Sequence, residues 1–229
     1  MASTLMYKLP HGFLQGPAPD LTKTKIDFNK QGLPEYRDAW AVVLDGVLTA
    51  KECKTLLEAA EATTDGKWER ALVNIGGGMQ AMYEDARKCG RIIWDNKEIM
   101  TRLWARTEAS VPEIHRLQNW AEVTGYGPVK PHCDGAYETP DGTERSYFTL
   151  HLYLNDAVEK HGVRQLEGGA TTFFSGNLDQ RIDVEPKAGR VLLFQHRNLI
   201  HSGDDVISGT KYTLRTDIMY AVEGRSNGA

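Results

Sequence analysis

Alternating polar and apolar positions dominate the second half of the chain. From residue 117 onward, short segments rich in β-branched and aromatic residues are separated by turns of Gly, Asp, Asn and Pro, a pattern typical of β-strands. Many short antiparallel strands of this kind suit a jelly roll of two sheets. We predict strands at residues 117–124, 147–154, 170–174, 190–194 and 211–220.

The first half carries the helical signals. Thr49 and Glu52 have the spacing of a capping box, and apolar residues follow at helical intervals, which predicts a helix over residues 50–62. Asp95 and Glu98 predict a second cap, followed by an amphipathic helix to about residue 110. Helices first and strands later favour an α+β plan over alternating βαβ units.

The other segments of the first half give weaker patterns. Residues 1–36 show little periodicity and predict an irregular arm packed on the domain, whereas residues 40–44 and 68–74 have the composition of strands. The glycines at 76–78 lack the spacing of a phosphate-binding loop. They indicate a flexible turn or, alternatively, a mobile loop over an active site.

Composition limits the class of protein. The 229 residues, 41% of them hydrophobic, predict one domain over 1–229, with a helical N-terminal support at 1–116 and a core at 117–222. The net charge of −4 argues against a nucleic-acid or anionic-membrane partner. Three cysteines without a CxxC pair predict neither a disulfide framework nor a zinc knuckle. With no signal core or apolar span visible, we expect a cytoplasmic protein.

The chemistry lies in residues 131–135, Pro-His-Cys-Asp-Gly. If this stretch is extended, His132 and Asp134 point to one face, and Cys133 points away as a packed side chain. A second histidine, His201, arrives after the run of predicted strands. Two histidines and one carboxylate with other positions open form the facial triad of non-haem Fe(II) oxygenases.

The second half resembles the Fe(II)/2-oxoglutarate-dependent dioxygenase superfamily, near its prolyl-4-hydroxylase-like branch. The resemblance covers about residues 117–220, and its segments occur in the family's order with suitable spacing. These segments are PHCDG at 131–135, TLHLYLN at 149–155, GGATTF at 168–173, PKAGRVLLF at 186–194, HSG at 201–203 and GTKY at 209–212.

The resemblance implies a double-stranded β-helix (jelly-roll) core with helices packed on one side. It also implies Fe(II) held by His132, Asp134 and His201, with 2-oxoglutarate and O2 as the other reactants. His196 competes as the distal ligand, but the position directly before Ser-Gly favours His201, and His196 is then expected near the site mouth or in solvent. The carboxylate of Asp134, which related halogenases lack, favours hydroxylation or another oxidation of an unactivated C–H bond, with release of succinate and CO2.

The segment 211–220 offers two anchors for the distal carboxylate of 2-oxoglutarate. Lys211, Thr213, Arg215 and Asp217 alternate onto one face. Lys211 matches the basic position of the prolyl hydroxylases and is the first choice; Thr213 would add a hydroxyl. Arg215 is the second choice, because a guanidinium binds a carboxylate through two parallel hydrogen bonds. Tyr126 is the candidate for the cosubstrate-contacting tyrosine, although the segment before His132 is shorter than usual.

The substrate is the least determined feature. No peptide-binding appendage is visible, so we expect a small-molecule substrate. Residues 74–91 could fold over the mouth of the site or form a solvated charged face. A protein (prolyl-type) hydroxylase and a non-catalytic metal-binding jelly roll are the alternatives. His151 reads as a structural histidine or, alternatively, as a group near the site, and the oligomeric state is not encoded in any pattern we recognise.

Overall fold

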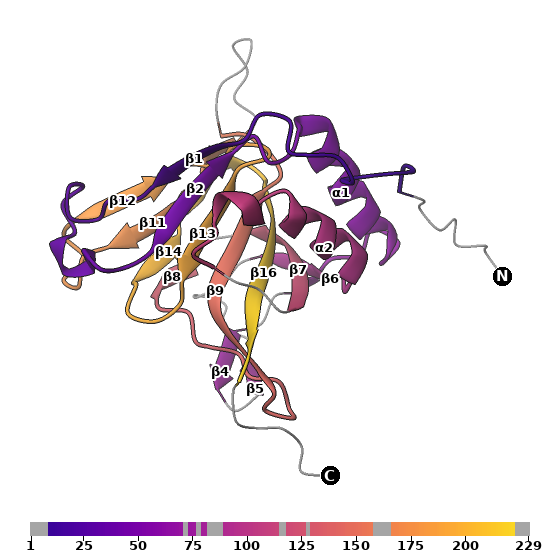
Figure 1. Ribbon diagram of the computed structural model, residues 1–229. Coiled ribbons are helices and arrows are strands. Elements are labelled where there is room, and N and C mark those ends of the chain that lie inside the picture. Colours follow the sequence, from indigo (N-terminus) through magenta and orange to yellow (C-terminus); the bar gives the residue numbers. More distant parts are fainter. Residues whose placement is uncertain are drawn as a thin grey trace.

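Two facing β-sheets and two helices make up the molecule (Figure 1). The structure is a computed structural model that describes residues 9–70, 73–76, 79–81, 89–114, 118–126, 129–157 and 166–222. The helices are α1 (Ala50–Ala62) and α2 (Lys97–Ala105); a short 3-10 helix precedes the first, η1 (Pro34–Tyr36), and another follows the second, η2 (Glu108–Ser110). In the described part of the chain, no helix combines the length and apolar character needed to cross a bilayer.

The larger sheet has eight strands, and its neighbours are antiparallel. The long strands β9 and β16 lie in its middle, so both their edges are paired. In spatial order the strands are β1 (Thr22–Lys25), β2 (Ala41–Asp45), β13 (Val191–Gln195), β9 (Glu144–Tyr153), β16 (Lys211–Ala221), β7 (Gln118–Tyr126), β6 (Gly90–Ile93) and β3 (Glu69–Arg70).

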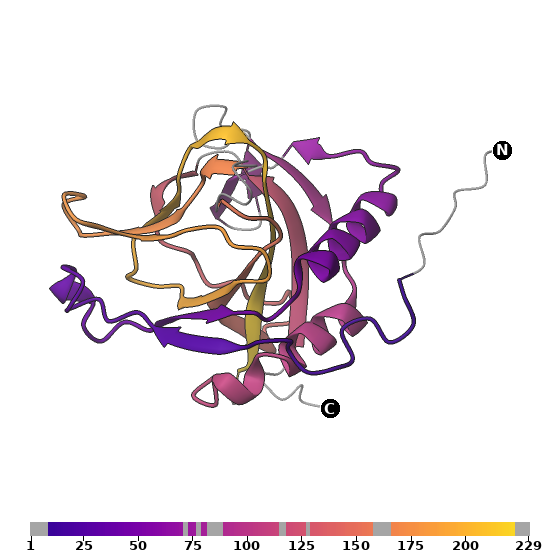
Figure 2. The same ribbon diagram turned by 90° about the horizontal axis from the view of Figure 1, so that it is seen from above.

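The smaller sheet lies on the opposite side from the helices (Figure 2). Two further strand pairs complete the described structure, β10 (Leu166–Gly168) with β15 (Val206–Gly209) and β4 (Val73–Gly76) with β5 (Met79–Ala81). The smaller sheet has the spatial order β12 (Arg181–Val184), β11 (Thr171–Phe174), β14 (His201–Gly203) and β8 (Val129–His132).

Strand pleating divides the apolar residues between two cores. On β13, Val191 and Leu193 belong to the core shared with the helices, whereas Leu192 and Phe194 belong to the core between the sheets. All four are almost completely buried, as expected for a strand covered on both faces. The predicted α+β class, with a jelly-roll core and helices on one side, is confirmed.

Helix α1 forms as the sequence predicts. Thr49 accepts a hydrogen bond from the backbone of Glu52, and the Glu52 side chain accepts one from the backbone of Thr49, so the capping box is complete. The second predicted cap is wrong by one residue. Asn96, not Asp95, accepts the hydrogen bond from the Ile99 backbone, and α2 ends at Ala105 rather than near residue 110.

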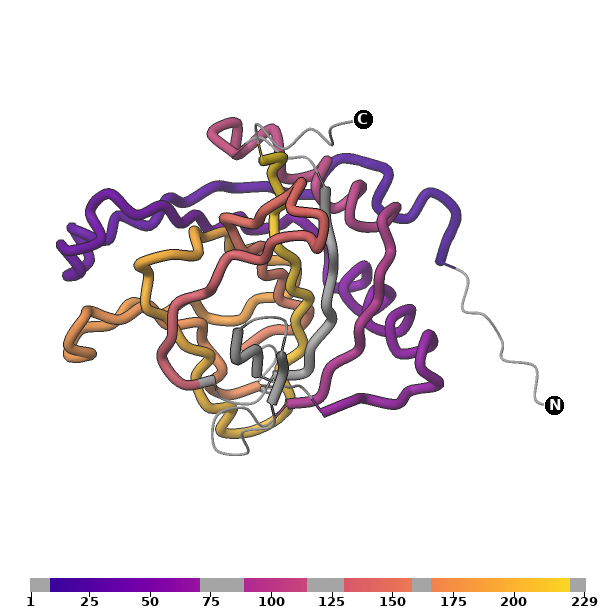
Figure 3. Tube along the Cα trace, turned by 90° about the horizontal axis from the view of Figure 1, so that it is seen from below, coloured from indigo at the N-terminus to yellow at the C-terminus, as the bar shows by residue number. Residues whose placement is uncertain are grey.

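The N-terminal arm is more regular than predicted. Residues 22–25 form β1, which pairs with β2, and Figure 3 traces this early segment beside strands from much later in the chain. The predicted strand at 68–74 is broken into β3 and β4, with residues 71–72 outside the described part. The five strands predicted in the second half are confirmed, with ends shifted by a few residues.

Gly189 links the end of strand β9 to the segment that precedes α1. Its amide donates to the carbonyl of Tyr153 and its carbonyl accepts from Val47, each at 3.0 Å. Its φ is +79°, and an added Cβ would lie 1.8 Å from the carbonyl oxygen of Leu48. Only glycine fits this crossing without a shift of the backbone.

We predict that Gly189→Ala lowers the free energy of unfolding by at least about 2 kcal/mol, because it adds both a disfavoured φ and a steric overlap. Gly176→Ala is the matched control, since its Cβ would meet nothing within 4 Å and should change stability by less than about 0.5 kcal/mol. Urea unfolding of the two variants measures this. Equal stabilities would show that the crossing at Gly189 adjusts freely.

Candidate metal centre

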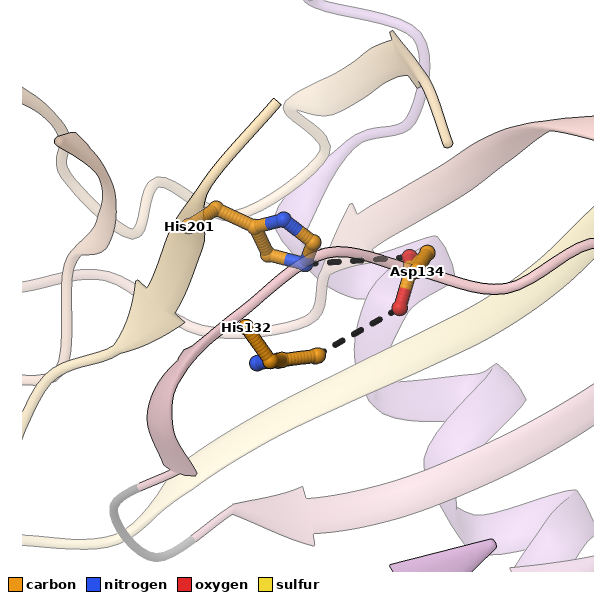
Figure 4. Close-up of side chains that lie close together, drawn as sticks. All are labelled: His132, Asp134 and His201. Carbon is orange, nitrogen blue, oxygen red and sulfur yellow. Dashed lines mark ion pairs between the residues drawn. The ribbon is translucent and has the colours of Figure 1, made fainter. Parts of the chain in front are cut away.

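The two histidines of the predicted triad are direct neighbours across strands of the smaller sheet. His132 ends β8 and pairs in register with His201 at the start of β14, and their ring centroids are 4.4 Å apart. Asp134 follows two residues after His132 and turns its carboxylate toward both rings (Figure 4). The fold thus brings together side chains that are far apart in the sequence.

One ligand atom from each of these residues lies within 4.8 Å of the other two. The Nε2 atom of His132 is 3.4 Å from Asp134 Oδ1, and that of His201 is 3.7 Å from Asp134 Oδ2. The other ring nitrogen, Nδ1, faces a backbone carbonyl in both histidines, that of Lys130 at 2.9 Å and that of Leu199 at 3.1 Å. With Nδ1–H donating to these carbonyls, the Nε2 lone pairs face the carboxylate, as in histidine metal ligands.

Asp134 is held in its ionised form. The residue is 7% exposed, and burial alone would raise its pKa. The positive charge of Arg215 and the contacts with the two histidines outweigh burial and hold the pKa well below its usual range. Thr149 donates a hydrogen bond of 2.7 Å to Oδ2, and Arg215 Nη2 lies 3.0 Å from the same oxygen.

His201 is neutral at physiological pH. Burial lowers the pKa of His201 to about 4, against the opposing effect of the Asp134 charge. His132 is the more accessible ligand, with 40% of its side chain exposed. A neutral imidazole and an ionised carboxylate are the protonation states that bind a metal cation.

The triad opens into a pocket between the sheets, with about 450 Å³ of empty space when the adjoining open solvent is included. The sequence alone did not assign most of the lining residues to a site. Thr149 and His151 lie two residues apart on one predicted strand, and this spacing, which places both on the same face, is a signal that could have found them. The lining residues are His132, Asp134, Thr149, His151, Thr171, Phe194, His201, Ser202, Gly203 and Arg215.

His151 lines the same pocket as the triad. It is 5% exposed, stacks on the ring of Tyr153 at a centroid distance of 4.8 Å, and pairs across strands with Arg215. Burial, then the charges of Lys211 and Arg215, hold its pKa well below the usual range. His151 therefore presents a neutral imidazole to the pocket.

Two sequence predictions about this region are wrong. Cys133 was predicted as a packed side chain, but it is exposed because β8 ends at His132 and the strand alternation stops there. His196 was placed at the site mouth or in solvent, but it is 1% exposed, and its Nε2 lies 3.7 Å from Asp217 Oδ1.

The polar face of β16 turns toward the pocket side of the sheet. Arg215 lines the pocket, whereas Lys211 lies beside Tyr153, with its Nζ 5.5 Å from the ring centroid. The Tyr153 hydroxyl donates to Thr171, which does line the pocket. Thr213 is completely buried in register with Tyr153.

Two predicted features fall largely outside the described residues. Tyr126 is placed only by its backbone, which ends β7 opposite Lys211. Of the segment 74–91, which was considered as a cover for the site, residues 77–78 and 82–88 are not described.

Comparison with known proteins gives one family match. The sequence profile described as the 2OG-Fe(II) oxygenase superfamily matches residues 120–216, a range that contains all three triad residues. No curated protein matches the chain.

Solved structures share the fold at low sequence identity. A prolyl-4-hydroxylase from Pseudomonas putida superposes with a TM-score of 0.56 at 15% identity, over 81% of this chain and 95% of that one. A Trichoplax adhaerens prolyl hydroxylase, in complex with a hypoxia inducible factor peptide fragment, gives 0.57 at 13% identity, over 83% and 88%. A viral collagen prolyl hydroxylase from Paramecium Bursaria Chlorella virus-1, in a 2OG complex, gives 0.53 at 21% identity, over 78% and 95%.

These structural likenesses establish the double-stranded β-helix fold, and the profile match spans the residues of the triad. Residues 120–216, which hold the triad, are similar to the 2OG-Fe(II) oxygenase superfamily, whose members use Fe(II), 2-oxoglutarate and O2.

Proposed function

We propose that this enzyme hydroxylates an unactivated C–H bond of a small molecule, using one Fe(II) held by His132, Asp134 and His201. The observation that carries the assignment is the convergence of two Nε2 atoms and one carboxylate within 4.8 Å. Two imidazoles and one carboxylate suit Fe(II) and leave other coordination positions open for 2-oxoglutarate and O2. Backbone carbonyls that fix both Nδ1 atoms also support this fit.

The protein's part in the reaction is positioning and exclusion of water. The bound iron, with 2-oxoglutarate and O2, supplies the oxidation of the C–H bond, and succinate and CO2 are released. The ring of Phe194 packs edge-on against His201 at 4.8 Å and forms an apolar wall of the pocket. Such a wall keeps water from the reacting centre.

We assign the distal carboxylate of 2-oxoglutarate to Lys211, with Thr213 as its neighbour on the same face. Arg215 lies 3.0 Å from the metal-binding carboxylate of Asp134, which is too near the iron for the far end of a five-carbon chelator. The Cα atoms of residues 211 and 215 are about 13 Å apart, at ~3.3 Å per residue. Lys211 therefore lies farther from the metal-binding residues than Arg215 does, where the distal end of the cosubstrate would be expected.

A small-molecule substrate is the first candidate, because the pocket beside the triad lies between the two sheets and is lined by side chains from both, and small-molecule sites are clefts of this kind. A peptide substrate is the second candidate, favoured by the fold shared with the prolyl hydroxylase in complex with a peptide fragment. Succinate release assayed with panels of small metabolites and of proline-containing peptides separates the two. Hydroxylation of peptides alone would overturn the small-molecule assignment.

We predict that His201→Ala loses both iron and turnover. The variant lacks one of two imidazole ligands, so iron per chain should fall well below one and succinate release should fall by at least about 100-fold. Iron content and 2-oxoglutarate-dependent succinate release measure these effects.

His196→Gln is the control, because His196 is buried but lies outside the ligand group. It should keep one iron per chain. Loss of iron in the control with retention in His201→Ala would reverse the assignment of the distal ligand. Stoichiometric iron without succinate release, for any substrate tested, would favour the non-catalytic metal-binding alternative.

We predict that Lys211→Met weakens 2-oxoglutarate binding by at least about 100-fold, because a desolvated carboxylate loses its charged partner. The measurement is a calorimetric titration of the Mn(II)-loaded protein with 2-oxoglutarate. Arg215→Lys, which keeps a positive charge near the iron, should weaken this binding by less than about 10-fold. Parent-like binding by both variants would place the cosubstrate elsewhere.

We also predict that Lys211 gives the ligand-free protein a characteristic pH dependence. Burial lowers the pKa of Lys211 to about 8 from its usual value of 10.5. Between these values the unfolded chain binds a proton that the folded chain has released, so stability rises with pH. The unfolding free energy of the parent minus that of Lys211→Met should therefore rise by up to ~1.4 kcal/mol per pH unit over this window. Urea unfolding at several pH values measures it, and a constant difference would contradict the lowered pKa.

A further inference from the structure

We infer that Arg215 is a positioning residue that fixes the metal-binding carboxylate of Asp134, so that one of its oxygens is committed to the protein and the other faces the metal. This inference rests on the metal site proposed above. It assigns to Arg215 a role different from that of the cosubstrate anchor.

The contacts of Asp134 separate its two oxygens. Oδ2 accepts the hydroxyl of Thr149 at 2.7 Å and lies 3.0 Å from Arg215 Nη2. Each oxygen also faces one histidine, Oδ1 at 3.4 Å from His132 Nε2 and Oδ2 at 3.7 Å from His201 Nε2, but the contacts with Thr149 and Arg215 are both made by Oδ2. A carboxylate held in this way offers a single oxygen to the metal. A coordination position that bidentate binding by this carboxylate would occupy then stays available to the reactants.

Arg215 is itself held in place. Its Nη2 lies 3.5 Å from Asp217 Oδ1, and Asp217 in turn lies 3.7 Å from Nε2 of the buried His196. The two strands reinforce this arrangement, because Asp217 is in register with Thr149, the second residue that binds Asp134. A row of contacts therefore runs from the metal ligand along one face of β9 and β16.

A purely electrostatic role and a positioning role for Arg215 predict opposite changes in metal affinity when the residue is removed. A cation beside the site repels a divalent metal ion, so deleting it should tighten metal binding if charge were its only contribution. If Arg215 fixes the carboxylate, deleting it frees Asp134 to rotate, so the carboxylate must be ordered when the metal binds and binding should weaken. Outer partners of metal ligands typically contribute 10- to 100-fold in affinity. The sign of the change is thus diagnostic.

The experiment compares the parent, Arg215→Leu and Arg215→Lys by titration with Mn(II) and by the visible absorption of the Co(II)-loaded protein. We expect Arg215→Leu to bind Mn(II) about 10- to 100-fold more weakly and to show an altered Co(II) spectrum. Arg215→Lys keeps the charge but not the planar fork, so its affinity should lie between those of the parent and Arg215→Leu.

Arg190→Leu is the matched control. Arg190 makes two contacts with Asp45, at 2.8 and 3.0 Å, and its side chain is 19% exposed against 26% for Arg215. Neither residue of that pair belongs to the ligand group. Its removal should lower stability and leave Mn(II) affinity and the Co(II) spectrum unchanged, which separates positioning from general loss of structure.

Tighter or unchanged Mn(II) binding by a folded Arg215→Leu variant, with a parent-like Co(II) spectrum, would overturn the inference. If circular dichroism shows that Arg215→Leu does not fold, Arg215→Lys decides: weaker binding with an altered spectrum supports the inference, and parent-like values overturn it. A parent protein that binds no metal would instead refute the proposed metal site, and this inference with it.

Discussion

Burial of strands β9 and β16 on both faces is the constraint from which the site follows. These strands lie in the middle of the eight-stranded sheet, and one face of each packs against the helices through residues such as Leu152 and Leu214. The other face carries ionised and polar groups into the interior, where an uncompensated charge is costly. The charged groups on that face must therefore be compensated by neighbours, and the contact between Arg215 and Asp134 is one result.

Sequence periodicity was sufficient for the elements long enough to show a period. Helix α1 and strands such as β9 and β16 span 10 to 13 residues, so their alternation or helical spacing repeats several times. Strand β14 has three residues and β8 has four, which is too few for a repeat to be distinguished from chance. Their positions depend on pairing with distant strands, so they are tertiary features.

The triad could be proposed from the sequence because two of its residues form a short motif and the third follows a recognisable series of strands. His132 and Asp134 are two residues apart, while the choice of His201 over His196 depended on resemblance. The alternation argument itself was incomplete: β8 ends at His132, so Cys133 lies beyond the strand and is exposed. The burial of His196 depends on its packing near Asp217, and no local pattern encodes that contact.

The two bases of β16 differ in a property that matches their positions. An arginine does not release its proton in proteins, so a partly buried guanidinium is stabilised by permanent negative partners. Arg215 lies between the carboxylates of Asp134 and Asp217. A lysine can adjust its charge to its surroundings, and burial lowers the pKa of Lys211 to about 8. A titratable base tolerates an anionic partner that arrives and leaves in each turnover, whereas a permanent cation suits a partner that stays. This difference supports Arg215 beside the fixed carboxylates and Lys211 at the place of the exchangeable one.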